Sequence, residues 1–148
     1  MSYITAADLE RRLGTAAYVS LTDDEATGSA DPGRVEEARL GAIGEADSYL
    51  AGRYQTPVDL TAHPEPAAVL KSFVLDLAEY RLHNRRPPVP ADIVRRHAEA
   101  IAWLSRVASG AVHLPVASSP ASNASRGTLA RITGPGRVFR RDDAETTL

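Results

Sequence analysis

The chain has 148 residues, of which 43% are hydrophobic and 24% are charged, and this composition is typical of one globular domain with a modest core. No apolar run is long enough to span a bilayer, and residues 1–10 lack the layout of a signal peptide. We therefore expect no membrane contact and a protein that acts inside the cell that makes it. A net charge of -2 argues against binding of nucleic acid through phosphate neutralisation, and the lack of cysteine excludes disulfides and thiol chemistry.

Four segments of the first 110 residues carry helical signals. Thr5 and Asp8 have the spacing of a capping box, which predicts a short helix over residues 6–13. Proline-led starts and apolar side chains at helical spacing predict three further helices, over residues 32–53, 66–84 and 90–110. Residues 15–30 are rich in turn-forming residues and are predicted as a loop with one helical turn. The fold class is therefore all-α, a small bundle of about four helices.

The composition changes after Gly110. Residues 115–125 are rich in Ser, Ala and Pro, which is typical of a linker, so we place a domain over 1–110 and an extended C-terminal arm over 111–148. Two short segments around Gly134–Pro135–Gly136 have the pattern of a β-hairpin. The arm's apolar residues are too few to fold alone, and we expect them to dock on a partner and to be mobile in the isolated subunit; these are Leu129, Ile132, Val138 and Phe139.

Two of the predicted helices have faces that their own apolar stripe does not explain. In the helix over 66–84, Leu75 and Leu82 lie opposite the main stripe, so this helix either sits centrally in its own bundle or contacts another subunit. The helix over 32–53 carries Gly41, Gly44 and Ser48 on one face, although glycine is unfavourable within a helix. Close approach of a second subunit would offset that cost, and a tolerated surface position is the alternative. We predict that the face with Gly41, Gly44 and Ser48, or the face with Leu75 and Leu82, is covered by another subunit in the assembled state.

Charged and histidine side chains on these helices give little sign of catalysis. We predict a structural ion pair between Arg53 and Asp76, because each lies on or beside an apolar face. His97 falls on an apolar stripe and is more typical of a hydrogen-bonded core histidine than of a metal ligand. Asp76, Glu79 and His83 are close in sequence, but charged neighbours at this spacing are common on helix flanks. The sequence predicts a protein without catalytic residues, metal or cofactor.

Residues 3–110 resemble a known family. The resemblance begins with Tyr3-Ile4-Thr5, Asp8-Leu9 and Leu13-Gly14, continues with Leu21-Thr22-Asp23, and is most specific at Tyr49-Leu50-Ala51-Gly52-Arg53-Tyr54 before Pro57. It then continues in the right order with Asp76-Leu77-Ala78, Tyr80-Arg81-Leu82, Ala100-Ile101, Trp103-Leu104, Val107-Ala108 and Gly110. This pattern is similar to that of the Mu-like prophage virion proteins, which look like head-to-tail adaptor or neck proteins.

The resemblance implies a structural role in a tailed phage. The expected protein is a subunit of a closed homo-oligomeric ring, a dodecamer, that binds below the portal protein and helps to join head to tail. Its expected partners are further copies of itself, the portal protein and a tail-side neck or tail terminator protein, with DNA only as cargo through the lumen. Its expected location is the neck of the virion, and the host cytoplasm during assembly. The alternative from composition alone is a cytoplasmic helical module that binds or regulates another protein.

Overall fold

The structure is a computed structural model and describes residues 2–117. Within this range the chain forms five helices: α1 (Ala6–Leu13), α2 (Thr15–Thr22), α3 (Pro32–Leu50), α4 (Pro64–Asn84) and α5 (Ala91–Ser109). No strand occurs among the described residues, which confirms the all-α prediction. The arm residues Leu129, Ile132, Val138 and Phe139, and the predicted hairpin that contains them, lie outside the described residues.

Local signals in the sequence set most of the helix ends. The Thr5 hydroxyl accepts from the Asp8 amide while the Asp8 carboxylate accepts from the Thr5 amide, and this reciprocal cap starts α1. The Asp31 carboxylate accepts from the amide of Gly33 and so starts α3 behind Pro32. Gly110 ends α5 in the left-handed conformation, with φ of 85°, which glycine adopts without strain. The capping pattern was therefore readable from the sequence.

The segment after α1 differs from its prediction as a loop. Residues Thr15–Thr22 form a two-turn helix, α2, with no side-chain hydrogen bond at its first turn. Its stability comes from packing, because Tyr18 and Leu21 are buried in the shared core and the fully buried Thr22 hydroxyl donates to the Tyr18 carbonyl. A short helix held by tertiary contacts has weak local signals, which is why the sequence favoured a loop.

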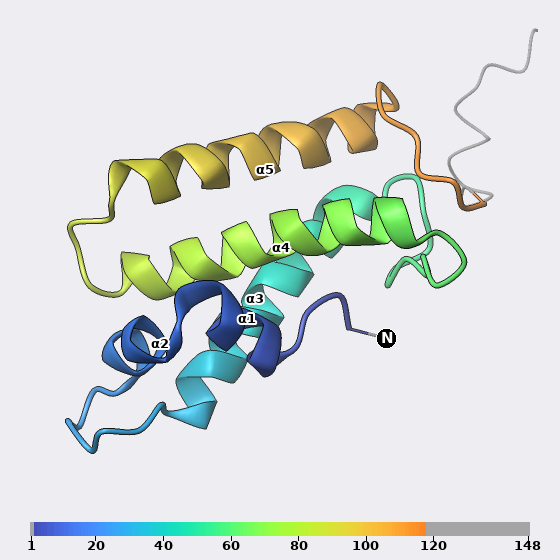
Figure 1. The fold of residues 1–148 in the computed structure, drawn as a ribbon. Coiled ribbons are helices and arrows are strands. Elements are labelled where there is room, and N and C mark those ends of the chain that lie inside the picture. The colour runs from blue at the N-terminus through green and yellow to red at the C-terminus, as the bar shows by residue number, and fades with distance from the viewer. Residues whose placement is uncertain (1, 118–148) are drawn as a thin grey trace, which may run out of the picture.

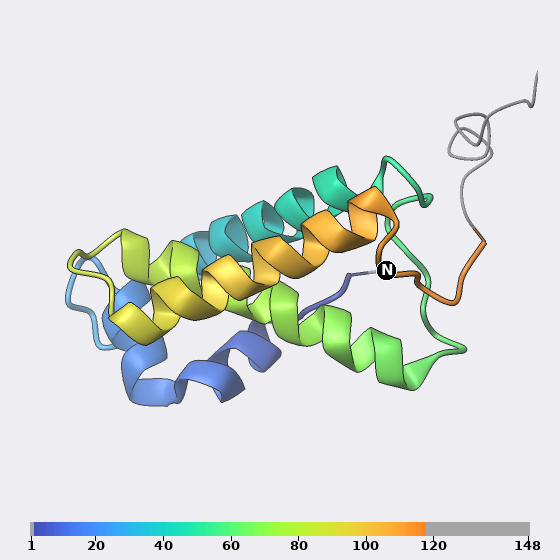
Figure 2. The ribbon, with the colours of Figure 1, turned by 90° about the horizontal axis from the view of Figure 1, so that it is seen from above.

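α4 is the central helix of the bundle. α4 and α5 form a long antiparallel hairpin, and α3 packs against both of them (Figure 1). α1 and α2 lie at one end of the molecule and also contact α4, as the view from above shows (Figure 2). Both apolar sides of α4 are consequently buried within the chain: Leu77 and Leu82 are 0% exposed and Leu75 is 8% exposed. The central position, one of the two readings of this helix, accounts for its second apolar stripe.

The chain remains packed on the bundle after α5. The Leu114 amide donates to the Tyr54 hydroxyl at 2.9 Å, and the Leu114 side chain is buried in the core with Val112 and Val116 packed beside it. The compact part therefore extends at least to residue 117, beyond the boundary that we placed at residue 110 from composition. The shift arises because these three apolar residues, which come just before the serines of the linker, are enough to dock on a preformed surface. Among the described residues, no helix is long and apolar enough to cross a membrane.

Candidate functional site

Four charged side chains meet where α1, α4 and α5 pack together. Asp76 and Glu79 of α4 are largely buried, and Arg12 of α1 and Arg96 of α5 reach them from either side. Arg12 contacts both carboxylates, and Arg96 donates to Glu79 at 2.8 and 3.1 Å and to Asp76 at 3.4 Å. We call these four residues the charge cluster. Each buried carboxylate has arginine partners, so the cluster joins three helices.

The electrostatics of the charge cluster reflect its burial. Desolvation raises the pKa of Asp76 above its ordinary value, and the positive charges of Arg12 and Arg96 oppose that rise. Hydrogen bonds from Arg96 to the Glu79 carboxylate raise the pKa of Arg96 above its usual value. Across residues 2–117 no group of three acidic or histidine side chains is placed to hold a metal ion. Asp76 and Glu79 pair with arginines of two other helices, and these ion pairs link α4 to α1 and α5.

The structure does not bring together the predicted pair of Arg53 and Asp76. The Arg53 guanidinium lies against Gly110 at the C-terminal end of α5, so closely that a Cβ at Gly110 would collide with it. Asp76 lies near Arg96, close to the opposite end of α5, and takes Arg12 and Arg96 as partners. The prediction was wrong because helical spacing shows which face a residue occupies but not which level of the neighbouring helix it meets.

His97 contacts a tyrosine of the neighbouring helix. Its ring stacks on Tyr80 of α4 with ring centroids 3.9 Å apart and an angle of 24° between the planes. The side chain is half-buried on the apolar side of α5. This position agrees with packing between α4 and α5 and places the imidazole on an aromatic ring.

The predicted interface residues divide into covered and open positions. Leu75 and Leu82 are buried within their own chain, so a second subunit cannot cover them, and this part of the interface prediction was wrong. Gly41 lies under the guanidinium of Arg81, which pairs with Glu45 at 2.8 Å.

Gly44 and Ser48, by contrast, are exposed on α3. A Cβ at Gly44 would meet no atom within 4 Å. Leu40, one helical turn before Gly44, is 53% exposed. We call Leu40, Gly44 and Ser48 the open face of α3.

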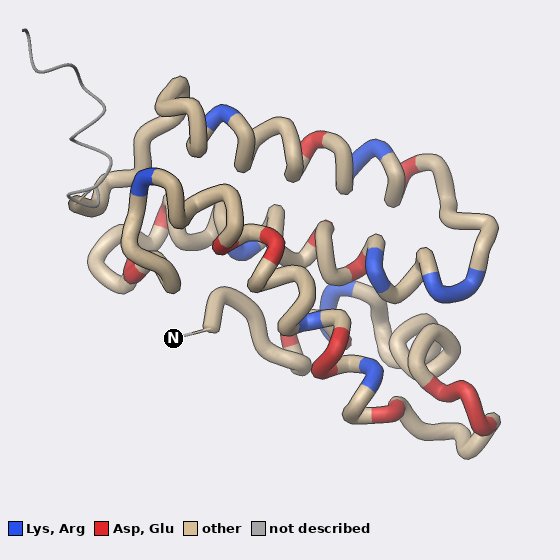
Figure 3. The backbone as a smooth tube through the Cα atoms, turned by 180° about the vertical axis from the view of Figure 1, so that it is seen from behind, with Lys and Arg blue, Asp and Glu red and all other residues tan. Residues whose placement is uncertain are grey.

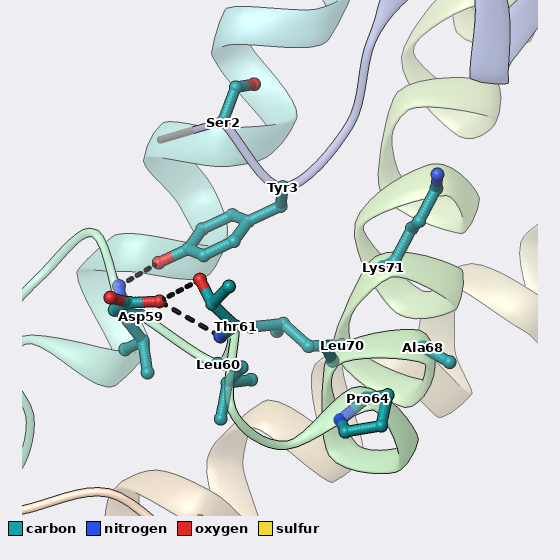
Figure 4. Close-up of a pocket in the computed structure, with 11 residues that line it drawn as sticks. Ser2, Tyr3, Asp59, Leu60, Thr61, Pro64, Ala68, Leu70 and Lys71 are labelled. Carbon is teal, nitrogen blue, oxygen red and sulfur yellow. Dashed lines mark hydrogen bonds between the residues drawn. The ribbon is translucent and has the colours of Figure 1, made fainter.

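A groove lies at the other end of α4 from the α1–α2 corner. It has a volume of about 410 Å³ and lies between the N-terminal segment, the loop before α4 and the first turns of α4 (Figure 4). Its walls are mainly apolar and include Tyr3, Val58, Leu60, Ala68 and Leu70. Sequence reasoning missed this groove, because three segments distant in the sequence form it and none carries a motif of its own.

Tyr3 fixes one wall of the groove. Its hydroxyl donates to the Asp47 carboxylate at 2.6 Å and accepts from the Val58 amide at 2.8 Å, which ties the N-terminal segment to α3 and to the loop. Burial, with the hydrogen bond to Asp47, raises the pKa of Tyr3 well above its ordinary value. The hydroxyl therefore stays protonated, and the wall is held by two directed hydrogen bonds.

The rim of the groove carries charged groups of both signs. Asp59 accepts hydrogen bonds from the amide and the hydroxyl of Thr61, and these bonds lower the pKa of its exposed carboxyl (Figure 4). Lys71 on the facing side of the groove pairs with Asp8 of α1 at 2.6 Å. The charge of Lys71 is therefore offset by its own chain, whereas Asp59 presents a negative charge at the rim.

The last described residues lie beside this groove. Val116 and Ala117 line a neighbouring hollow together with residues 54–59, and that hollow shares Val58 and Asp59 with the groove. Residues 118–148 therefore continue from a point next to the groove wall.

Charges elsewhere on the described surface are mixed. Seen from behind, basic and acidic positions alternate along α5 instead of gathering on one side (Figure 3). At the loop before α3, Asp24 pairs with Arg85 and Arg86, which directly follow α4, and the Arg86 contact is 3.1 Å. In these two places the basic side chains therefore stand beside acidic ones.

Comparison with known families gives a match over residues 3–131 to the family described as Bacteriophage Mu, Gp36. The match covers well over half of the chain. The chain belongs to this phage family. No curated protein matches the chain. The match includes all five helices and continues past Ala117 into the arm, so family membership is not limited to the helical bundle.

Proposed function

We propose that this member of the Bacteriophage Mu, Gp36 family is a structural, non-enzymatic subunit of the ring that joins head to tail. The observation that supports a phage structural or morphogenetic role is the family match over residues 3–131. The described residues are compatible with a structural role, because the buried carboxylates Asp76 and Glu79 are held by arginines.

The proposed assembly is a closed homo-oligomeric ring, a dodecamer, in the neck of the virion. Its proposed partners are the portal protein above and a tail-side neck or tail terminator protein below, with DNA passing through the lumen as cargo. Ring closure requires each copy to use two different surfaces, because head-to-tail contacts around a cyclic ring are heterologous. The open face of α3 supplies one such surface, since Gly44 and Ser48 allow close approach and Leu40 is half exposed.

The test of this proposal uses Gly44 in the full-length protein. Gly44→Trp places a bulky side chain where the chain has open space, so the fold of the subunit should persist. We expect native mass spectrometry to show rings for the natural protein and smaller species for the variant. The matched control is Ala98→Trp, at an exposed position of α5, which should still form rings.

Two results would contradict the proposal. A natural protein that stays monomeric at all concentrations, also with portal protein added, would contradict the proposed ring. Normal rings from Gly44→Trp would show that the open face of α3 is not part of the interface. Gly41 is unsuitable for this test, because a side chain there would displace Arg81 from Glu45 and disturb the subunit itself.

A further inference from the structure

The groove beside Tyr3 has apolar walls with no described segment of the chain over them. Val58, Leu60 and Leu70 belong to the hydrophobic core and form the floor of the groove, while Ala68 is small and exposed, so the groove remains open along α4. A hollow of this size accommodates a few aliphatic or aromatic side chains rather than a whole helix. The occupant should therefore be a short extended peptide with spaced apolar residues.

The arm of the chain has this composition. Between residues 126 and 141 it carries five arginines and no acidic residue, interspersed with the apolar residues Leu129, Ile132, Val138 and Phe139. The preceding residues 1–117 have 12 basic and 16 acidic residues, so the two parts have opposite net charge. At the groove rim, Asp59 presents an exposed carboxylate to an arginine of such a peptide, and Glu65 is exposed in the first turn of α4.

The position of Ala117 and the length of the linker allow this arm to reach a neighbouring copy. Residues 118–128 separate Ala117 from Leu129, and such a linker spans at most about 40 Å when fully extended. A domain of this size has a radius of gyration of about 13 Å, so the groove of an adjacent copy in contact lies within that reach.

The described surface also gives a reason for exchange between copies. Its large exposed hydrophobic residues are Leu40 on α3, Val69 on α4 and Val94 on α5, one on each of three helices. Stable association commonly buries about 800 Å² on each partner around an apolar centre. Three separate residues do not form such a centre, so a ring of these subunits needs a further apolar contact.

We propose that the groove lined by Tyr3, Leu60 and Leu70 binds residues 129–139 of a neighbouring copy of this chain. This inference rests on the proposed ring and identifies its second contact surface. The apolar residues of the arm fill the groove, and its arginines face Asp59 and Glu65. Each subunit gives one arm and receives another, which is a head-to-tail contact that closes around a ring.

The test takes advantage of the absence of cysteine from the natural chain. One full-length variant carries Ala68→Cys in the groove, and a second, with a different affinity tag, carries Thr133→Cys between the apolar pairs of the arm. The two are mixed, assembled and treated with a short bis-maleimide. We expect covalent dimers that contain both tags. The matched control mixes Thr133→Cys with Ser20→Cys, at an exposed position of α2 at the far end of the bundle, and should give at least about tenfold less of this product.

The remaining outcomes overturn the inference in distinct ways. Yields equal to those of the Ser20→Cys control show that the arm does not occupy the groove. A chain carrying both Ala68→Cys and Thr133→Cys that cross-links only within itself places the arm in its own groove. Ring formation is measured separately by native mass spectrometry. Rings without mixed dimers would contradict the exchange of arms but not the ring. Mixed dimers without rings would contradict the proposed neck ring but not the exchange of arms.

Discussion

Two regions of α4 differ in how completely other described parts of the chain cover their side chains. In the middle of the helix, Asp76 and Glu79 are buried and both are held by Arg12 and Arg96. At the start of the helix, Ala68 and Leu70 line a groove that no described segment fills. The first region has the properties of a structural joint, and the second those of a binding surface. In this molecule the charge cluster therefore holds helices together, whereas the apolar groove, which has no sequence motif, is the candidate contact surface.

The strongest test of this comparison removes a carboxylate from the charge cluster. Glu79→Ala leaves Arg12 and Arg96 without one of their partners in a largely buried setting. Because both arginines are about a quarter exposed, we expect a loss of about 3 kcal/mol, at the lower end for a broken buried pair. Urea unfolding measures this change. The exposed pair Arg95–Glu99 is the control, and Glu99→Ala should cost under about 0.5 kcal/mol. Equal effects of the two variants would contradict a structural role for the cluster.

A second test concerns the segment after α5, which joins the bundle to the arm. Leu114 is buried and its amide is bonded to Tyr54, so Leu114→Ala should destabilise the domain by about 2 kcal/mol. Truncation after Gly110 should therefore lower the thermal midpoint, whereas truncation after Ala117 should leave it nearly unchanged. If truncation after Gly110 has no effect on thermal unfolding, residues 111–117 do not belong to the domain.

A smaller effect is expected from Asp8, which links α1 to the groove side of α4. Hydrogen bonding from Lys71, with further bonds from Thr5, lowers the pKa of Asp8 to about 2 in the folded chain, below an unfolded value near 3.8. A carboxyl with a lowered folded pKa stabilises the fold above the unfolded value, and this contribution is lost as the pH falls from about 4 to about 2.

The corresponding variant is Asp8→Asn. Because Lys71 is 42% exposed, we expect a cost of about 1 kcal/mol at pH 7 that disappears near pH 2. Unfolding free energies of both proteins over this range give the measurement. A difference that is independent of pH would show that the carboxylate charge at position 8 contributes nothing, and that the change acts through the helix cap alone.

Much of the fold could be predicted because its signals are local. The Thr5–Asp8 cap, the Asp31–Pro32 start and the Gly110 stop each depend on residues adjacent in the chain, and the predicted long helices differ from α3, α4 and α5 by only a few residues at their ends. α2 was missed because Tyr18 and Leu21 are held by contacts with distant segments. Long helices can thus be predicted from local sequence signals, whereas a short helix depends on tertiary contacts with its neighbours.

The candidate site was much less predictable, since it depends on how elements meet. The pairing of Arg53 with Asp76 failed because the level at which two helices cross is set by packing along their whole length. The groove joins Tyr3, Val58 and Leu70, which are far apart in the sequence, and its apolar residues look like ordinary core positions. In contrast, the exposed position of Gly44 on α3 agrees with the face that helical spacing assigned to it.

The most direct test of the account asks whether filling the groove separates assembly from folding. Full-length Ala68→Trp, at an exposed position of α4 that lines the groove, is supplied to a phage lacking its own copy of this gene, with Ala98→Trp as the matched control. The account predicts that both variants melt within a few degrees of the natural protein. Ala68→Trp alone should weaken arm binding by at least about tenfold, or about 1.4 kcal/mol, and should reduce the number of tailed virions counted by electron microscopy. Normal numbers of tailed virions from well-folded Ala68→Trp would contradict it.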